Sequence, residues 1–125
     1  MSSDQTDISW FQGLEEEHWT SWGGSDVWIC SHKDREQRIK NLVRRYGVEG
    51  KDRMAFVLKC SGPSDDVVNP KGVAVDIVPL WYRGETPPKI DQISVNLHTK
   101  ISLRNSASLK VDQGGQLGML AVFSK

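Results

Sequence analysis

The sequence has few cysteines that could cross-link the chain and no apolar run long enough to span a membrane. It has only two cysteines, Cys30 and Cys60, among 125 residues, which excludes a disulfide framework. No apolar run approaches the roughly 20 residues that a transmembrane helix needs. The N-terminus has neither the basic region nor the apolar region of a secretory signal. We therefore expect an intracellular, soluble protein in which both thiols are reduced and buried.

Motifs of catalysis and cofactor binding are also missing. There is no glycine-rich phosphate loop, dinucleotide fingerprint, nucleophile elbow or zinc-protease motif. Cys30 and His32, with Cys60 or His18, lack the two paired-ligand spacings of structural zinc. We predict a protein that is not an enzyme and has no catalytic residues, no metal site, no cofactor and no small-molecule substrate.

Charge is balanced in total but not along the chain. Sixteen Lys and Arg residues match sixteen Asp and Glu residues, so the net charge does not point to nucleic acid or membrane. However, residues 1–32 carry a net charge of −6 and residues 33–59 carry +5. This segregation predicts either ion pairs within the chain or head-to-tail association between chains.

The clearest predicted helix covers residues 32–46. Ser31 suits its N-cap and Gly47 suits the position after its end. Its apolar face has the spacing of one side of a helix and consists of Ile39, Leu42, Val43 and Tyr46. A weaker stripe predicts a second helix over residues 8–22, and residues 1–7 are expected to be disordered.

From residue 53 onward the hydrophobic period changes to two, which is typical of strands. The predicted strands, six in all, cover 25–30, 53–60, 72–81, 93–103, 109–111 and 117–123, with a loop at 62–66. The alternation over 93–103 predicts one long strand with a polar face in water. The strand at 72–81 is apolar on both faces, so it should be central, with Pro79 at a bulge or at the end of pairing.

These patterns predict one domain over residues 1–125, of the mostly-β or α+β class. We expect an antiparallel sheet or β-sandwich of about six strands, with one or two packed N-terminal helices. Because the strands follow one another without intervening helices, a parallel doubly wound sheet is excluded.

The candidate binding residues are basic or aromatic. The polar side of the predicted helix carries Lys33, Arg38, Lys40, Arg44 and Arg45, a surface for an anionic partner or a neighbouring chain. A second basic row on the polar face of 93–103 consists of His98, Lys100 and Arg104, and it would extend that surface if the two elements lie side by side. Aromatic contact candidates are Trp10, Trp19 and Trp22, with an aromatic core as the alternative.

The strand pattern from Val75 to Trp81 and from Ile93 to Leu103, within residues 75–123, resembles that of small matrix proteins of negative-strand RNA viruses. The resemblance implies a β-sandwich with a few helices that self-assembles and uses basic surfaces on membranes and nucleocapsids, in the host cytoplasm or the virion. It is one of strand pattern and not of motif, so it carries over no functional residue. The balanced charge departs from the basic character usual in that family.

We therefore predict a non-catalytic interaction protein or self-assembling structural protein that forms homo-oligomers. Another protein, a nucleic acid or an anionic membrane surface are further candidate partners. One alternative is an immunity or inhibitor protein whose acidic, Trp-rich segment binds one basic partner. The other alternative is a metal-dependent nuclease in which Asp76 acts with Lys59 or His98.

Overall fold

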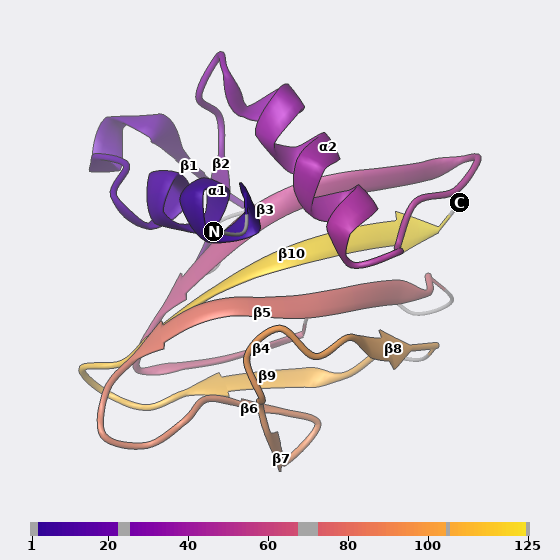
Figure 1. The fold of residues 1–125 in the computed structure, drawn as a ribbon. Helices are drawn as coiled ribbons and strands as arrows, with labels where there is room; N and C mark the ends of the chain where they lie inside the picture. The colour runs from indigo at the N-terminus through magenta and orange to yellow at the C-terminus, as the bar shows by residue number, and fades with distance from the viewer. Residues whose placement is uncertain (1–2, 23–25, 68–72, 105, 125) are drawn as a thin grey trace.

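The computed structural model describes residues 3–22, 26–67, 73–104 and 106–124 and has three layers (Figure 1). Two helices cover one face of a six-stranded sheet, and a four-stranded sheet packs against the other face. Every strand pair in both sheets is antiparallel. The predicted class, a strand-rich antiparallel protein with helices at the N-terminal end, is confirmed.

The six-stranded sheet has the order β1-β2-β3-β10-β5-β8. Its strands are β1 (Trp19–Ser21), β2 (Val27–Cys30), β3 (Arg53–Ser61), β10 (Gln116–Ser124), β5 (Val75–Arg83) and β8 (Ile101–Leu103). β10 pairs with β3 on one side and β5 on the other, which explains its continuous apolar run. β5 lies between β10 and β8, so its predicted central position is confirmed. Two residues of the predicted strands, 25 and 72, lie outside the described part of the chain.

Pro79 lies at a bulge, as its place in an apolar strand predicted. Gly118 pairs with Trp81, but Met119 pairs with Pro79, so Leu80 is the extra residue on β5. Proline cannot donate a ladder hydrogen bond, and the bulge accommodates it within a central strand. Gly118 lies so close to the Trp81 ring that a Cβ at this position would come within 2.2 Å of it. Only glycine therefore fits here without a shift of the ring.

The four-stranded sheet has the order β4-β9-β6-β7. Its strands are β4 (Ser64–Val67), β9 (Ser108–Val111), β6 (Lys89–Ile90) and β7 (Ile93–Ser94). The predicted loop at 62–66 is wrong from Ser64 onward, because β4 begins there and pairs with β9. The turn-forming residues of this segment gave no sign of a strand. The core between the two sheets includes the fully buried residues Leu58, Ile77, Leu109, Leu117 and Met119.

The predicted long strand at 93–103 is wrong. The chain leaves β7 after Ser94, adopts a left-handed conformation at His98 (φ 65°) and re-enters a sheet only in β8. The His98 N–H donates to the Pro79 carbonyl at 2.8 Å, so the segment crosses from the four-stranded sheet to the six-stranded one. Ile93 is 71% exposed and Leu97 is 38% exposed, so part of the predicted apolar face lies in water.

Helix α2 (Arg35–Arg45) confirms the predicted basic helix but begins later than expected. Ser31 is not its N-cap, because the Ser31 hydroxyl donates to the His18 carbonyl at 3.1 Å. Ile39 and Leu42 are buried against the six-stranded sheet. Gly47 adopts φ 65° after the helix, the left-handed conformation expected of a glycine at this position.

Helix α1 (Ser3–Gln12) corrects two expectations. The helix predicted over 8–22 ends at Gln12, because the following residues form a short 3-10 helix, η1 (Glu16–His18), and the edge strand β1. The expected disorder of residues 1–7 is wrong from Ser3 onward, and Asp7 is buried; residues 1 and 2 lie outside the described part of the chain. Neither described helix has the length and apolar character to cross a bilayer.

Candidate functional site

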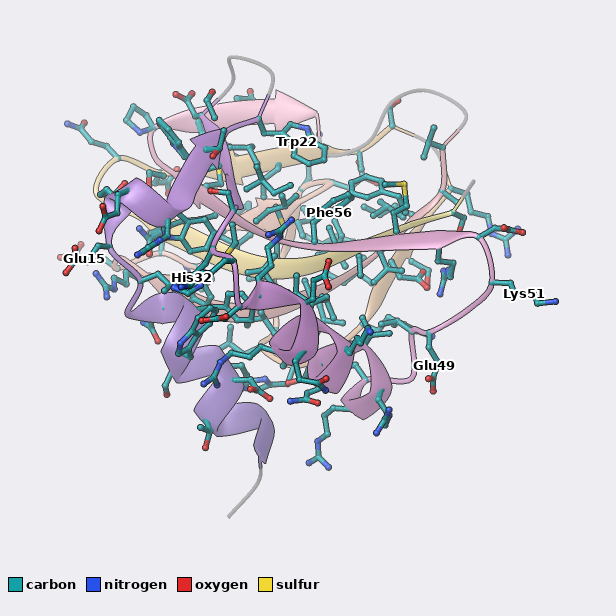
Figure 2. All side chains as sticks on the ribbon, turned by 90° about the horizontal axis from the view of Figure 1, so that it is seen from above. Glu15, Trp22, His32, Glu49, Lys51 and Phe56 are labelled. Carbon is teal, nitrogen blue, oxygen red and sulfur yellow. The ribbon has the colours of Figure 1, made fainter. Side chains whose placement is uncertain are left out.

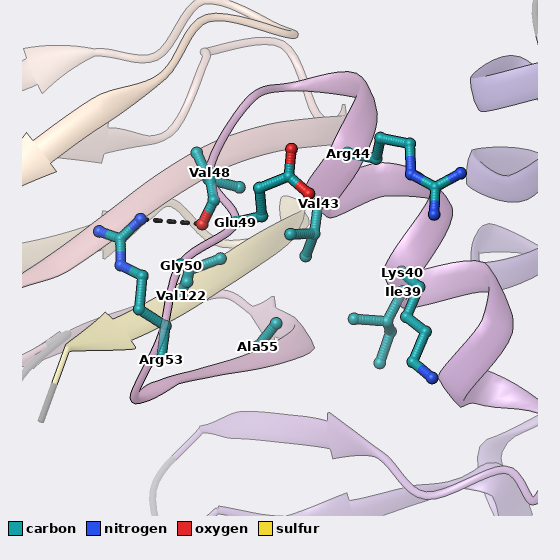
Figure 3. Close-up of a pocket in the computed structure, with 10 residues that line it drawn as sticks. All are labelled: Ile39, Lys40, Val43, Arg44, Val48, Glu49, Gly50, Arg53, Ala55 and Val122. Atoms are coloured by element: carbon teal, nitrogen blue, oxygen red, sulfur yellow. Dashed lines mark hydrogen bonds between the residues drawn. The ribbon is translucent and has the colours of Figure 1, made fainter.

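A groove runs along the C-terminal half of α2 (Figure 3). Its volume is about 420 Å³, and its walls come from α2, the chain after it, β3 and β10. The ten lining residues are Ile39, Lys40, Val43, Arg44, Val48, Glu49, Gly50, Arg53, Ala55 and Val122. We call this cavity the α2 groove.

The α2 groove has an apolar floor and a charged rim. The floor includes Val48 and Val122, each 1% exposed. Lys40 and Arg44 line the groove from α2, and their charged ends extend outward beyond the helix (Figure 3). Among the described residues, neither of these two side chains has a hydrogen-bond or ion-pair partner. The rim therefore offers two available cations one helical turn apart.

Arg53 forms the opposite wall and is held in place by three elements. Its guanidinium donates to the Val48 carbonyl at 2.8 Å, to the Asp76 carboxylate at 2.5 Å and to the Ser124 hydroxyl at 3.3 Å. These bonds connect β3, β5, β10 and the chain after α2. Arg53 therefore gives the groove a rigid wall, with its charge balanced by Asp76.

The surroundings of the Asp76 carboxylate favour its ionised form. Burial alone would raise its pKa, but hydrogen bonds from Ser102 and Arg53 and the charges of Arg53 and Lys100 outweigh burial, so the pKa of Asp76 is lowered. The ion-pair partner of this half-buried carboxylate is Arg53. The nuclease alternative required Asp76 to act with Lys59 or His98, a pairing that none of these bonds provides.

The structure separates the five basic residues predicted on this helix into three groups, and Lys33 lies just before α2. Arg38 is turned toward α1, where it pairs with the Asp7 carboxylate at 3.0 Å and lies 4.6 Å from the centre of the Trp10 ring. Lys33 and Arg45 are exposed but do not line the groove. Of the five predicted basic residues, Lys40 and Arg44 are therefore the two that line the α2 groove.

The second basic row lies close to this site, although not on the long strand that was predicted to carry it. The Tyr46 hydroxyl at the end of α2 and His98 Nδ1 are hydrogen-bonded at 2.8 Å. Lys100 lies near enough to Asp76 to lower its pKa. Arg104 is exposed after β8, and no contact places it at the groove. His98 therefore lies at the end of α2 and Lys100 lies near Asp76, while the prediction that the row extends the basic surface stays a prediction.

The three tryptophan candidates differ in their environments. Trp19 is 5% exposed and packs edge-on to Trp81, so the prediction of a contact surface is wrong there and the core alternative holds. Trp10 is half-buried between Phe11 and α2. Trp22 is half-buried and stacks on Phe123 at 6.0 Å, next to Phe56 (Figure 2).

Part of the predicted charge segregation is neutralised within the chain. Besides Asp7 and Arg38, the acidic segment supplies Glu16, which pairs with the buried Lys59 ammonium at 3.0 Å. Lys59 also lies 4.5 Å from the centre of the Trp19 ring. The prediction of ion pairs within the chain is therefore confirmed for two basic side chains, but not for Lys40 or Arg44.

The cysteines and histidines show no metal centre in the described part of the chain. Cys30 and Cys60 are buried and form no disulfide. Burial raises the pKa of the Cys30 thiol more than a backbone hydrogen bond from His32 and the charge of Arg35 lower it, which makes this thiol a weak nucleophile.

Sequence reasoning identified the α2 side of the groove and missed the other side. Val48, Arg53 and Val122 come from two segments that become neighbours only when β3 pairs with β10. Gly47 was the one sequence feature that pointed to the residues after α2. A glycine that ends a helix reverses the chain, which places the next residues beside the helix.

No family model, curated protein or solved structure matches this chain in comparisons with known proteins. The geometry of the site is therefore the basis on which a function is proposed.

Proposed function

We propose that this is a non-catalytic interaction protein whose α2 groove binds an acidic segment of a partner protein. The observation that carries the proposal is the pair of available cations, Lys40 and Arg44, on the rim of an apolar cavity. In this arrangement, an apolar side chain of the partner fills the cavity while flanking carboxylates meet the rim.

The composition of the groove favours a peptide over a nucleic acid. None of its ten lining residues is aromatic, so it offers no platform on which a base could stack. A phosphate backbone would also leave the floor of Val48, Ala55 and Val122 unused. An acidic segment with one apolar residue uses both the floor and the rim.

Glu49 is the one acidic residue among those that line the groove. It lies after α2 and reaches toward Val43 (Figure 3). Its charge opposes an anionic partner on that side, so the carboxylates of the partner are expected to approach Lys40 and Arg44. Removing the Glu49 charge should therefore strengthen binding.

A second candidate function is head-to-tail self-association, favoured by the positions of the remaining charges. Glu15 lies at one end of the molecule, while Glu49, which lines the groove, and Lys51 lie at the other end (Figure 2). Glu15 and Glu17 are exposed, so the acidic turn of one copy could reach the groove of the next. Such a contact is heterologous and can form a ring or an extended layer, the behaviour implied by the resemblance to viral matrix proteins.

The test is fluorescence anisotropy with a short labelled peptide in which glutamates flank one leucine. We expect binding that weakens as sodium chloride is raised. K40E/R44E should weaken it by at least about tenfold, and E49Q should strengthen it.

Two controls separate the groove from general attraction. K33E/R83E makes the same change in net charge at exposed residues outside the groove and should leave the affinity within about twofold. A peptide with glutamines in place of glutamates should lose binding. Equal losses in K40E/R44E and K33E/R83E would contradict a specific groove.

A further inference from the structure

Two lysines lie directly opposite each other on the outer face of the four-stranded sheet. Lys89 on β6 pairs in register with Lys110 on β9. Their neighbours Ile90 and Leu109 are buried toward the other sheet, so both lysines point outward. Side chains at such a position have Cβ atoms about 5 Å apart, and like charges there are destabilising.

Edge protection does not explain this pair. Lysines often occupy edge strands, where they prevent pairing with other chains. Here the edges of the sheet are β4 and β7, while β9 and β6 are its two inner strands. The repulsion therefore lies at the centre of the sheet.

The surroundings leave the two charges available. Asp65 on β4 is in register with Lys110. Within the described ranges, neither lysine forms an ion pair, and Asp65 forms no ion pair either. A cavity of about 390 Å³ lies over this surface, lined by Asp65, Lys89, Gln92, Ser108 and Lys110. The two lysines outweigh Asp65, so the lining of this cavity has a net positive charge. Gln92 and Ser108 are neutral side chains that can donate hydrogen bonds.

The hairpin between β6 and β7 brings Gln92 to this cavity. Asp91 and Gln92 adopt left-handed conformations, with φ of 53° and 69°. Ile90 pairs with Ile93, so the two residues between them form a two-residue hairpin turn, which requires a positive φ at both positions. Gln92 thereby joins Ser108 on the rim of the cavity.

We propose that this cavity, the Lys89–Lys110 site, binds the phosphoryl groups of a small soluble molecule. A doubly charged anion between the two ammonium groups converts their repulsion into two attractions, with Ser108 and Gln92 as further donors. The site is on another layer of the protein from the α2 groove and does not depend on its function.

The test uses inorganic pyrophosphate as the probe, with calorimetric titration and thermal unfolding. We expect saturable binding and a rise in Tm of roughly 3 °C or more at ten times the dissociation constant. K89Q and K110Q should each weaken binding by at least about tenfold. Each should unfold, without ligand, at a Tm equal to or above that of the unmodified protein, because the repulsion is gone.

Three controls make the result decisive. Sodium chloride at matched ionic strength screens the lysines without bridging them, so an equal rise in Tm in that salt would overturn the proposal. K51Q, an exposed lysine outside the cavity, should keep pyrophosphate binding. K40Q/R44Q should also keep it; if that variant loses binding while K89Q and K110Q retain it, the anion binds at the α2 groove and the proposal is wrong.

Discussion

Individual charged residues in this protein have distinct tasks, even when they are neighbours on one helix. Arg38 pairs with the buried Asp7 and covers Trp10, which fixes α1 to α2. Arg44, less than two turns further along, has no partner in the described chain. Arg38 therefore stabilises the fold, and a charge change there would confuse folding with binding, which is why the binding test uses Lys40 and Arg44.

The Arg53–Asp76 pair predicts a pH-dependent contribution to stability. The pKa of Asp76 is lower in the folded protein than its ordinary value, so its contribution is complete above the ordinary carboxyl pKa of about 4 and is lost as pH falls through the folded value. D76N should reduce the free energy of unfolding by about 1–3 kcal/mol at pH 7.

The measurement is urea unfolding of D76N and the unmodified protein from pH 7 down to pH 2. The difference between the two should shrink as the pH falls below about 4. E85Q removes a carboxylate from an exposed residue and should unfold as the unmodified protein does at every pH. A difference for D76N that stays constant with pH would show that the loss does not come from the carboxylate charge.

At the scale of elements, α2 and the strands β3, β5 and β10 could be predicted because their local patterns agree with their final positions. The apolar spacing in α2 puts Ile39 and Leu42 against the sheet. In contrast, residues 93–103 alternate as one strand would, yet only Ile93–Ser94 and Ile101–Leu103 are strands, and these belong to different sheets. Alternation reports which side chains share a face, but not which sheet the backbone joins.

The candidate site could be predicted from sequence only in part, for a related reason. Lys40 and Arg44 belong to a helix, whose faces follow from local spacing. The floor and far wall depend on the long-range pairing of β3 with β10, which places Ala55 opposite Val122. No local pattern encodes that register, so a cavity between these elements and α2 could not be predicted.

Helix α2 yields a stability prediction at this scale. Leu42 is fully buried, so L42A should lower the free energy of unfolding by about 2–5 kcal/mol through the lost contacts and the cavity left behind. K40A, two residues earlier on the exposed face, should change it by less than about 0.5 kcal/mol. Denaturant unfolding measures both, and an L42A loss as small as that of K40A would mean that this face of α2 is not packed as described.

At the scale of the whole molecule, the helices give one face of the central sheet its binding groove and the four-stranded sheet occupies the other face (Figure 1). The chain is neutral overall, so long-range steering by net charge is weak. Recognition is therefore expected to be local, through the two rim cations and the apolar floor, with ion pairs worth about 0–1 kcal/mol each.

The arrangement of charges also predicts the oligomeric state. If the acidic turn of one copy enters the groove of the next, sedimentation velocity at about 100 μM in low salt should show species larger than a monomer. K40E/R44E should shift them toward the monomer, as should raised salt. A strict monomer under these conditions would exclude self-association and leave a partner protein as the occupant of the groove.

The central claim, that an acidic segment binds in the α2 groove, is tested most directly by mapping amide chemical shifts during titration with the glutamate–leucine peptide. We expect chemical-shift changes that saturate together and centre on Lys40, Arg44, Val48 and Gly50, and no such changes with the glutamine peptide. Shifts that centre elsewhere, or none at peptide concentrations up to about 1 mM, would contradict it.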